Sequence, residues 1–378
     1  MQSLQLFISI AITLILARKL GIGISLLISS FILGIFTVGF NGLINCYLQL
    51  QSVELMLVVF LTYTLANTMD NTGMLEKLSK SLNESFGSLS IALIPLLIGL
   101  IPMPAGALVS ASMLLPITKD SKISPEKLTV INYWFRHVWT PVWPLYPSVI
   151  IALAVLGVQY EHYLFATLPI ALVSFILGFT LLRGLSFNLK ISGLRKMVSS
   201  LYPIFILLAL YLITKILLLS IAVSLLMVII LEKEKLRNFR RVIKKSLDFR
   251  VLILVFAVMG YKNIIQLSNS ARILYEEMSF VPLEISALLV SFLVGFSTGI
   301  EVSYSSISLP IFHEFAKDPG NLLLLISAGF FGVMLSPFHL CYALTVEYFK
   351  AKFMNCYKML IKLTLPSILI LLILALII

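Results

Sequence analysis

A few charged and polar residues lie beside helix-breaking sequences inside long apolar stretches of this chain. Arg136 and His137 precede the pair Thr140-Pro141, and His339 follows the pair Ser336-Pro337. A guanidinium can pair with an anion, and an imidazole can exchange a proton near neutral pH. These side chains are candidates for holding a solute, although a buried histidine is often only a neutral, hydrogen-bonded core residue.

The two hydroxyl-proline pairs predict helices that stop and restart. Each has a Thr or Ser suited to an N-cap, followed by a Pro suited to the first helical position. Free backbone groups within a membrane cost several kcal/mol each unless they are buried in protein or face a polar cavity. A kink for packing is the simpler reading of one break, but two matching breaks indicate a solute site. The predicted solute-binding residues are Arg136, His137, Thr140, Gly106, Ser336 and His339.

Two apolar hairpins, at about 88–117 and 282–313, precede these breaks. Their tips read PMPAGA (102–107) and FSTGIEVSYSS (296–306). Hydroxyl and carbonyl oxygens suit a hard cation such as Na⁺, and Glu301 could bind a cation or a proton. Close packing of the serines and a structural salt bridge of Glu301 are the alternatives. The predicted cation or proton site comprises Ser110, Thr298, Gly299, Glu301 and Ser305.

The composition predicts an all-α polytopic membrane protein in the cell membrane. Of 378 residues, 60% are hydrophobic and 12% are charged, far from the balance of a soluble domain. We attribute the net charge of +11 to cytoplasmic Lys and Arg and expect no nucleic-acid partner. The scattered cysteines, Cys46, Cys341 and Cys356, show neither disulfide nor metal spacing. No cofactor and no metal beyond Na⁺ are expected.

The chain contains two similar halves, 1–190 and 191–378. SASMLLPI (110–117) aligns with SSISLPIF (305–312), and FRHVWTPVWPLY (135–146) aligns with FGVMLSPFHLCY (331–342). The segment 41–54 has no Lys or Arg, whereas its counterpart 232–250 has eight. Because cytoplasmic loops are rich in basic residues, the halves are predicted to be inverted repeats.

Inversion requires an odd number of crossings in each half, so we predict five spans and one re-entrant hairpin per half, with the N-terminus outside. The first-half spans are expected at 2–17, 21–40, 54–69, 127–155 and 163–183. The second-half spans are expected at 202–214, 216–231, 251–265, 320–347 and 360–378. The broken helices are those at 127–155 and 320–347.

The motifs IPMPAGALVSA, NYWFRH with WPLYP, and LSPFHLCYALTVEYF resemble an uncharacterised membrane family labelled domain of unknown function 401. The architecture resembles the ion transporter superfamily, which includes dicarboxylate/sodium symporters, citrate and gluconate permeases and arsenite permeases. This resemblance implies a homodimeric elevator-type transporter, in which spans 1–3 and 6–8 form a scaffold. The chain has Pro104-Ala105-Gly106 and Ser297-Thr298-Gly299 in place of the symporters' Ser-Asn-Thr tip signature.

We therefore expect a secondary transporter, coupled to Na⁺ or H⁺, that moves a small anionic solute by alternating access. One alternative is a cation/proton exchanger that uses Glu301 and an intramembrane histidine. The other is an intramembrane enzyme that uses His339 and Cys341. No HExxH or phosphate-loop motif supports the enzyme, so no enzymatic activity is expected.

Overall fold

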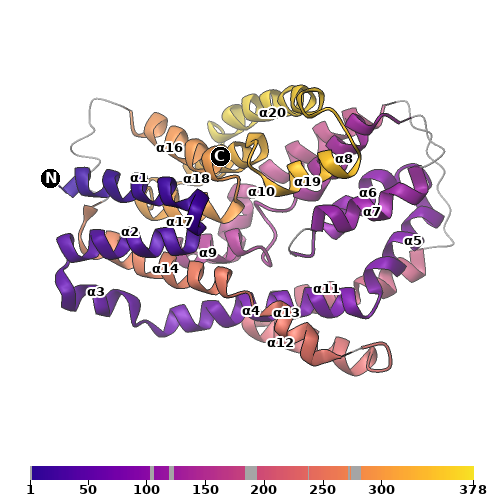
Figure 1. The fold of residues 1–378 in the computed structure, drawn as a ribbon, viewed down its shortest axis with the longest axis horizontal. Coiled ribbons are helices and arrows are strands. Elements are labelled where there is room, and N and C mark those ends of the chain that lie inside the picture. Colours follow the sequence, from indigo (N-terminus) through magenta and orange to yellow (C-terminus); the bar gives the residue numbers. More distant parts are fainter. Residues whose placement is uncertain are drawn as a thin grey trace.

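A computed structural model describes residues 2–102, 106–118, 123–183, 194–236, 238–270, 273 and 282–378 of the chain. The regular structure of these residues is helical (Figure 1). Among the described residues, six helical stretches are long and apolar enough to cross a membrane, and some of them consist of two consecutive helices. They are Gly39–Asn71, Tyr160–Leu182, Lys196–Thr214, Phe249–Leu267, Pro319–Tyr348 and Phe353–Ala375. The protein is therefore a helical, polytopic membrane protein, as its composition predicts.

The first half contains α1 (Gln2–Leu20), α2 (Ile22–Thr37), α3 (Gly39–Tyr47), α4 (Leu50–Asn71), α5 (Met74–Phe86), α6 (Ser90–Ile98), α7 (Gly106–Thr118), α8 (Pro125–His137), α9 (Pro147–Leu156), α10 (Tyr160–Gly178) and the 3-10 helix η1 (Phe179–Leu182). The pair α6 and α7 occupies the first predicted hairpin. The pair α8 and α9 divides the span predicted at 127–155.

The second half contains α11 (Leu194–Thr214), α12 (Leu217–Leu231), α13 (Phe239–Ser246), α14 (Phe249–Leu267), α16 (Leu283–Thr298), α17 (Glu301–Ile311), the 3-10 helix η3 (Phe315–Lys317), α18 (Pro319–Leu335), α19 (Leu340–Tyr348) and α20 (Phe353–Ala375). Here α16 and α17 occupy the second predicted hairpin. The pair α18 and α19 divides the span predicted at 320–347.

Contacts within one half have counterparts in the other. Helix α6 packs against α8 as α16 packs against α18, and α1 packs against α2 as α11 packs against α12. The halves also exchange contacts: α7 packs against α19, and α17 packs against α9. The second arm of each hairpin therefore lies against the restarted helix of the other half.

Both helices restart later than predicted, so Thr140-Pro141 and Ser336-Pro337 are not the N-terminal pairs. The first restart is at Pro147, with Tyr146 as an extended N-cap residue. A helix that began at Pro141 would lack the N–H groups of Pro144 and Pro147 in its hydrogen-bonded part. The last proline of the series therefore decides where α9 begins.

In the second half, α19 begins at Leu340 after the extended N-cap residue His339. The hydroxyl of Ser336 donates to the carbonyl of Phe296 at 2.6 Å and accepts a bond from the Phe338 N–H at 3.2 Å. Ser336 is the C-cap residue of α18. It closes one helix and holds the hairpin instead of starting the next helix.

Glycines allow α16 and α18 to approach closely. A Cβ placed on Gly295 would lie 2.4 Å from the carbonyl oxygen of Gly329, and one on Gly332 would lie 2.3 Å from that of Phe292. Neither distance is compatible with a side chain, so these backbones touch directly. Small residues at such crossings are typical of helices packed within membranes.

Two sequence predictions fall partly outside the described residues. One is the first hairpin tip, of which Pro104 and Ala105 are not described. The predicted join between the halves, near 184–200, is described from residue 194 onward.

Candidate functional site

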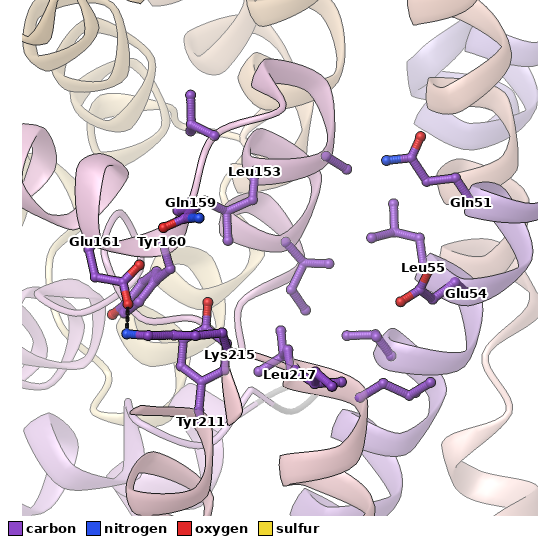
Figure 2. Close-up of a pocket in the computed structure, with 16 residues that line it drawn as sticks. Gln51, Glu54, Leu55, Leu153, Gln159, Tyr160, Glu161, Tyr211, Lys215 and Leu217 are labelled. Atoms are coloured by element: carbon purple, nitrogen blue, oxygen red, sulfur yellow. Dashed lines mark hydrogen bonds and ion pairs between the residues drawn. The ribbon is translucent and has the colours of Figure 1, made fainter. Parts of the chain in front are cut away.

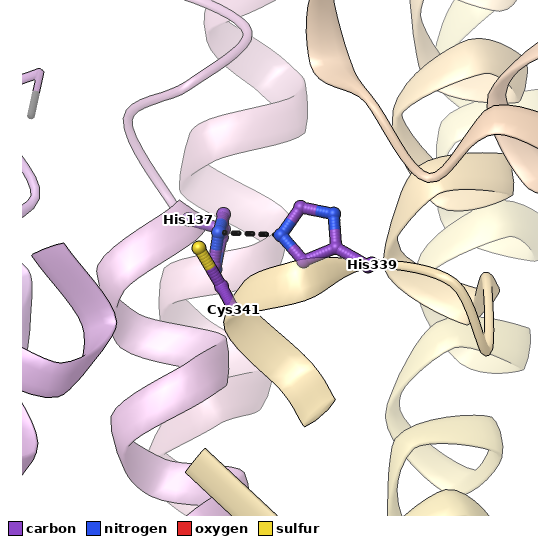
Figure 3. A group of neighbouring side chains, drawn as sticks. All are labelled: His137, His339 and Cys341. Carbon is purple, nitrogen blue, oxygen red and sulfur yellow. Dashed lines mark hydrogen bonds between the residues drawn. The ribbon is translucent and has the colours of Figure 1, made fainter. Parts of the chain in front are cut away.

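The two helix breaks meet through their histidines. His137 is the last residue of α8, and His339 is the N-cap residue of α19. Their Nε2 atoms lie 3.2 Å apart although the residues are separated by 202 positions (Figure 3). Both side chains are buried, at 1% and 4% exposure. Both residues belong to the solute-binding set predicted from the sequence, and in the structure they are in direct contact.

The second hairpin tip contributes a carboxylate to this contact. Glu301 is the first residue of α17, and its Oε1 lies 3.5 Å from Nε2 of His137. The Glu301 side chain is 17% exposed, so it is the most accessible of the three polar groups. Cys341, in the first turn of α19, places its Sγ within 4.8 Å of the ligand nitrogens of both histidines.

Gly299 brings the hairpin tip against the second break. It ends α16 in the left-handed conformation, with φ of 64°. A Cβ there would lie 2.7 Å from the backbone nitrogen of His339. Glycine is therefore required both by the backbone conformation and by the contact with the break.

Arg136 lies beside the cluster, at 3% exposure. Its Nη1 donates to the hydroxyl of Tyr146 at 3.4 Å, and this hydroxyl donates to the carbonyl of Gly99 at 2.6 Å. Its Nε has no hydrogen-bond partner among the described residues. Arg136 and Glu301 are near enough to interact electrostatically.

Two further donors of the first break lack partners. The buried Nε1 atoms of Trp139 and Trp143 make no hydrogen bond with any described residue. Unpaired buried donors are rare in proteins and call for an explanation, such as an ion or solute that binds there. Together with Nε of Arg136, they make the first break rich in free N–H groups.

The first hairpin reaches the same region through α7. Gly106 is the first residue of α7, and the neighbouring carbonyl of Ala107 accepts a bond from Nδ2 of Asn132 at 3.0 Å. The same Nδ2 donates to the hydroxyl of Thr345 at 3.4 Å. Asn132 thus ties the first hairpin to α8 and α19.

Thr140 lies within the first break but does not cap a helix. Its hydroxyl donates to the carbonyl of His137 at 2.9 Å and is fully buried. It supports the backbone at the end of α8 and leaves no hydrogen to donate to a solute.

Of the residues predicted to hold a cation, Glu301 is the one whose polar atom meets the histidines. Ser110 donates to backbone carbonyls of its own helix, and Thr298 bonds to Ser303 and to its own helix. Ser305 is buried on α17, and its hydroxyl has no partner among the described residues. The hydroxyls of Ser110 and Thr298 are already engaged, whereas that of Ser305 is not.

A cleft of about 410 Å³ lies at the other end of α9 (Figure 2). It is lined by α4, by the end of α9 and by the segment that joins α11 to α12, with Glu54, Gln159 and Tyr211 among its polar residues. Glu161 and Lys215 form an ion pair at its edge. None of the predicted site residues lines this cleft, so it is distinct from the histidine cluster.

Sequence reasoning did not assign Tyr146 to a site, and it named Cys341 only as a residue of the enzyme alternative. Tyr146 aligns with Tyr342 in the comparison of the halves. This match was the one feature of the sequence that could have pointed to Tyr146 as a site residue. Cys341 lies two residues after His339, a spacing that alone carries little information. The carbonyl of Tyr133, which lies 2.6 Å from Nδ1 of His137, could not have been found from residue types.

Comparison with known families extends over the whole chain. The family model described as "Protein of unknown function (DUF401)" matches residues 1–378. A search of curated proteins found no match. The family match agrees with the resemblance drawn from the motifs around the two breaks and the first hairpin. The chain therefore belongs to the DUF401 family of proteins of unknown function.

Proposed function

We propose that the protein is a secondary transporter of a small anionic solute, coupled to H⁺ or Na⁺. The observation that carries this proposal is the meeting of both helix breaks and the second hairpin tip at one buried point. There the Nε2 atoms of His137 and His339 are 3.2 Å apart, and Oε1 of Glu301 lies 3.5 Å from Nε2 of His137. Broken helices at corresponding places in two halves are the usual position of a transporter's binding site.

The anionic solute is proposed from the unsatisfied donors of the first break. Arg136 is buried and positively charged, and its Nε is unpaired among the described residues. Burying such a charge is costly unless a partner compensates it. A bound anion would supply that partner.

Coupling is proposed at Glu301 and His137. The carboxylate is partly accessible, whereas the imidazole is buried, so a proton or Na⁺ that reaches Glu301 would change the charge next to Arg136. A change of charge at this point alters the affinity of the site for an anion. Solute binding and ion binding would then be linked by an ordinary coupling free energy.

We further propose inverted repeats and an elevator-type mechanism in the cell membrane. The matching contacts of α6 with α8 and of α16 with α18, and the exchanged contacts between halves, support the repeat. Helices α1, α2, α4, α11, α12 and α14 would form the scaffold, and the hairpins with α8–α10 and α18–α20 would move. The cleft between α4 and α9 lies at this division. A homodimer is proposed from the family resemblance.

A cation/proton exchanger is the second candidate, favoured by the Glu301–His137 pair at 3.5 Å. It predicts proton release when Na⁺ is added to proteoliposomes without any organic solute. Vesicles that contain a pH-sensitive dye would reveal this flux, and no change in the dye signal would exclude exchange. We propose no enzymatic activity.

The test of the anion proposal begins with solute identification. Thermal unfolding of purified protein is measured with a panel of small anions, each in Na⁺ and in K⁺. A ligand at a hundredfold excess over its Kd stabilises the native state by about 2.7 kcal/mol. An anion whose effect requires Na⁺, or depends on pH, then becomes the uptake substrate in proteoliposomes.

Arg136→Gln is expected to lower uptake of that anion by at least roughly 30-fold, since losing one partner of a buried charge contact costs about 2–5 kcal/mol. Lys127→Gln is the matched control, because Lys127 lies on the same helix, α8, but is only partly buried and donates to the carbonyl of Arg183 instead of meeting the site. Uptake by Arg136→Gln at the wild-type rate would refute the anionic solute.

A further inference from the structure

Three potential metal ligands meet where the breaks join, and a fourth lies beside one of them. The three are a ring nitrogen of His137, a ring nitrogen of His339 and Sγ of Cys341. The fourth is a carboxylate oxygen of Glu301, which lies 3.5 Å from Nε2 of His137. They come from the end of α8, the start of α19 and the start of α17. Imidazole, thiolate and carboxylate together form a donor set suited to Zn²⁺ and related ions.

The separations of His137 from His339 and from Glu301 match those of ligands around a tetrahedral ion. Ligand nitrogens at about 2.0–2.1 Å from a tetrahedral metal lie about 3.3–3.4 Å from each other. The two Nε2 atoms are 3.2 Å apart, and Glu301 Oε1 lies 3.5 Å from Nε2 of His137. The sulfur lies within 4.8 Å of both nitrogens, so it needs to move by about 1 Å at most to reach the ideal N···S separation.

The tautomer of His137 prepares it for a metal. Its Nδ1 lies 2.6 Å from the carbonyl oxygen of Tyr133. A carbonyl only accepts, so Nδ1 carries the hydrogen and Nε2 presents its lone pair to His339 (Figure 3). A metal-bound histidine commonly donates its other N–H to a carbonyl or a carboxylate in this way.

The charges also balance. Two neutral imidazoles, one thiolate and one carboxylate carry a charge of about −2, which a divalent cation neutralises. A buried site of no net charge avoids the cost of burying an isolated ion. Arg136 would still be available for the anion, so metal and solute would not compete for one charge.

We propose that His137, His339, Cys341 and Glu301 bind one divalent transition-metal ion of the Zn²⁺ class. Binding itself depends only on the four side chains. This metal would be the cation that accompanies the solute, and that role rests on the proposed transport function. The metal would join both halves and the second hairpin at one point.

The experiment titrates Co²⁺, as a spectroscopic probe, and Zn²⁺, as a competitor, into purified full-length protein. One equivalent of Co²⁺ is expected to produce the absorption of a tetrahedral ion with a cobalt–thiolate charge-transfer band, and Zn²⁺ should displace it. Cys341→Ser should remove the thiolate band. His339→Gln and Glu301→Gln should weaken metal binding, with a rise in the Kd of at least about tenfold.

Cys356→Ser is the matched control, because Cys356 is also buried but its Sγ lies against the carbonyl of Glu126. It should retain the thiolate band and the wild-type Kd. Thermal unfolding without metal shows which variants are folded, and Glu301→Gln, at a partly exposed position, serves if the histidine variant does not fold. No stoichiometric binding to wild-type protein, or a thiolate band that persists in Cys341→Ser, would overturn the proposal.

Measurements of anion uptake, made alongside metal binding, test the metal site and the proposed transport function independently. If no metal binds but uptake still requires Arg136, the metal site is refuted and the transporter stands. If the metal binds with the expected variants and no anion is transported, the site stands and its role in transport is refuted.

Discussion

At the scale of single residues, the candidate site depends on positions where only one residue type fits. Gly299 combines a φ of 64° with a backbone that leaves 2.7 Å between a Cβ and the nitrogen of His339. Gly157 has a similar φ of 67°, but a Cβ there would meet nothing within 4 Å. A comparison of substitutions at the two glycines therefore distinguishes the effect of the backbone conformation from the effect of the tertiary contact.

We predict that Gly299→Ala lowers the free energy of unfolding by more than Gly157→Ala. Both substitutions force alanine into the left-handed conformation, at about 1–2 kcal/mol. Gly299→Ala also displaces the second break, which adds about 1–3 kcal/mol of overpacking. Thermal unfolding of the two purified variants measures the difference. Equal losses would show that the tip does not press against His339.

At the scale of elements, prolines and local hydrogen bonds determine where the helices break. Glycines allow certain helix pairs to pack closely. The α16–α18 pair presents the second hairpin tip to the second break. A Cβ on Gly332 would lie 2.3 Å from the carbonyl oxygen of Phe292, so this pair has no room for a methyl group. The packing of these two helices therefore determines where Glu301 lies.

Gly332→Ala is expected to destabilise the protein by about 1–3 kcal/mol through overpacking and to weaken any function that requires Glu301. Leu289→Ala on α16 is the control, because Leu289 is 55% exposed and its truncation should stay within about 0.5 kcal/mol. Thermal unfolding and ligand binding are measured for both. If the two variants behave alike, the close approach of α16 and α18 is not structurally important.

At the scale of the whole molecule, the proposed inversion of the two halves makes a prediction about sidedness. The segment after α2 lacks basic residues, whereas its counterpart after α12 has eight. Gln49 and Lys235 are exposed residues of these two segments. The positive-inside rule places the first outside and the second in the cytoplasm.

In intact cells, a membrane-impermeant maleimide should label Gln49→Cys strongly and leave Lys235→Cys at the background of the unsubstituted protein. After the cells are opened, both variants should react. Labelling of both positions from outside would place the two segments on the same side and refute inverted repeats. The opposite pattern, with only Lys235→Cys labelled from outside, would retain the inversion but reverse the orientation.

The sequence alone determined the helical elements, because apolar length, proline and glycine act within a few residues of their own position. The membrane class, both hairpins and the interrupted spans at 127–155 and 320–347 were predicted, and helices occupy them in the structure. The restart positions were predicted too early. Thr140 and Ser336 looked like N-caps, but the prolines that follow Thr140 and the bond from Ser336 to Phe296 place the starts at Pro147 and Leu340.

The sequence placed His137 and His339 in one predicted site, but only the tertiary structure shows that they touch and that Cys341 and Glu301 lie beside them. Their contact depends on the exchange of partners between halves, in which α17 packs against α9 and α7 against α19. No local pattern specifies such packing, because it results from the shapes of surfaces distant in the chain. The sequence thus named the residues that break helices and carry charge, and the packing of the halves determined which of them are neighbours.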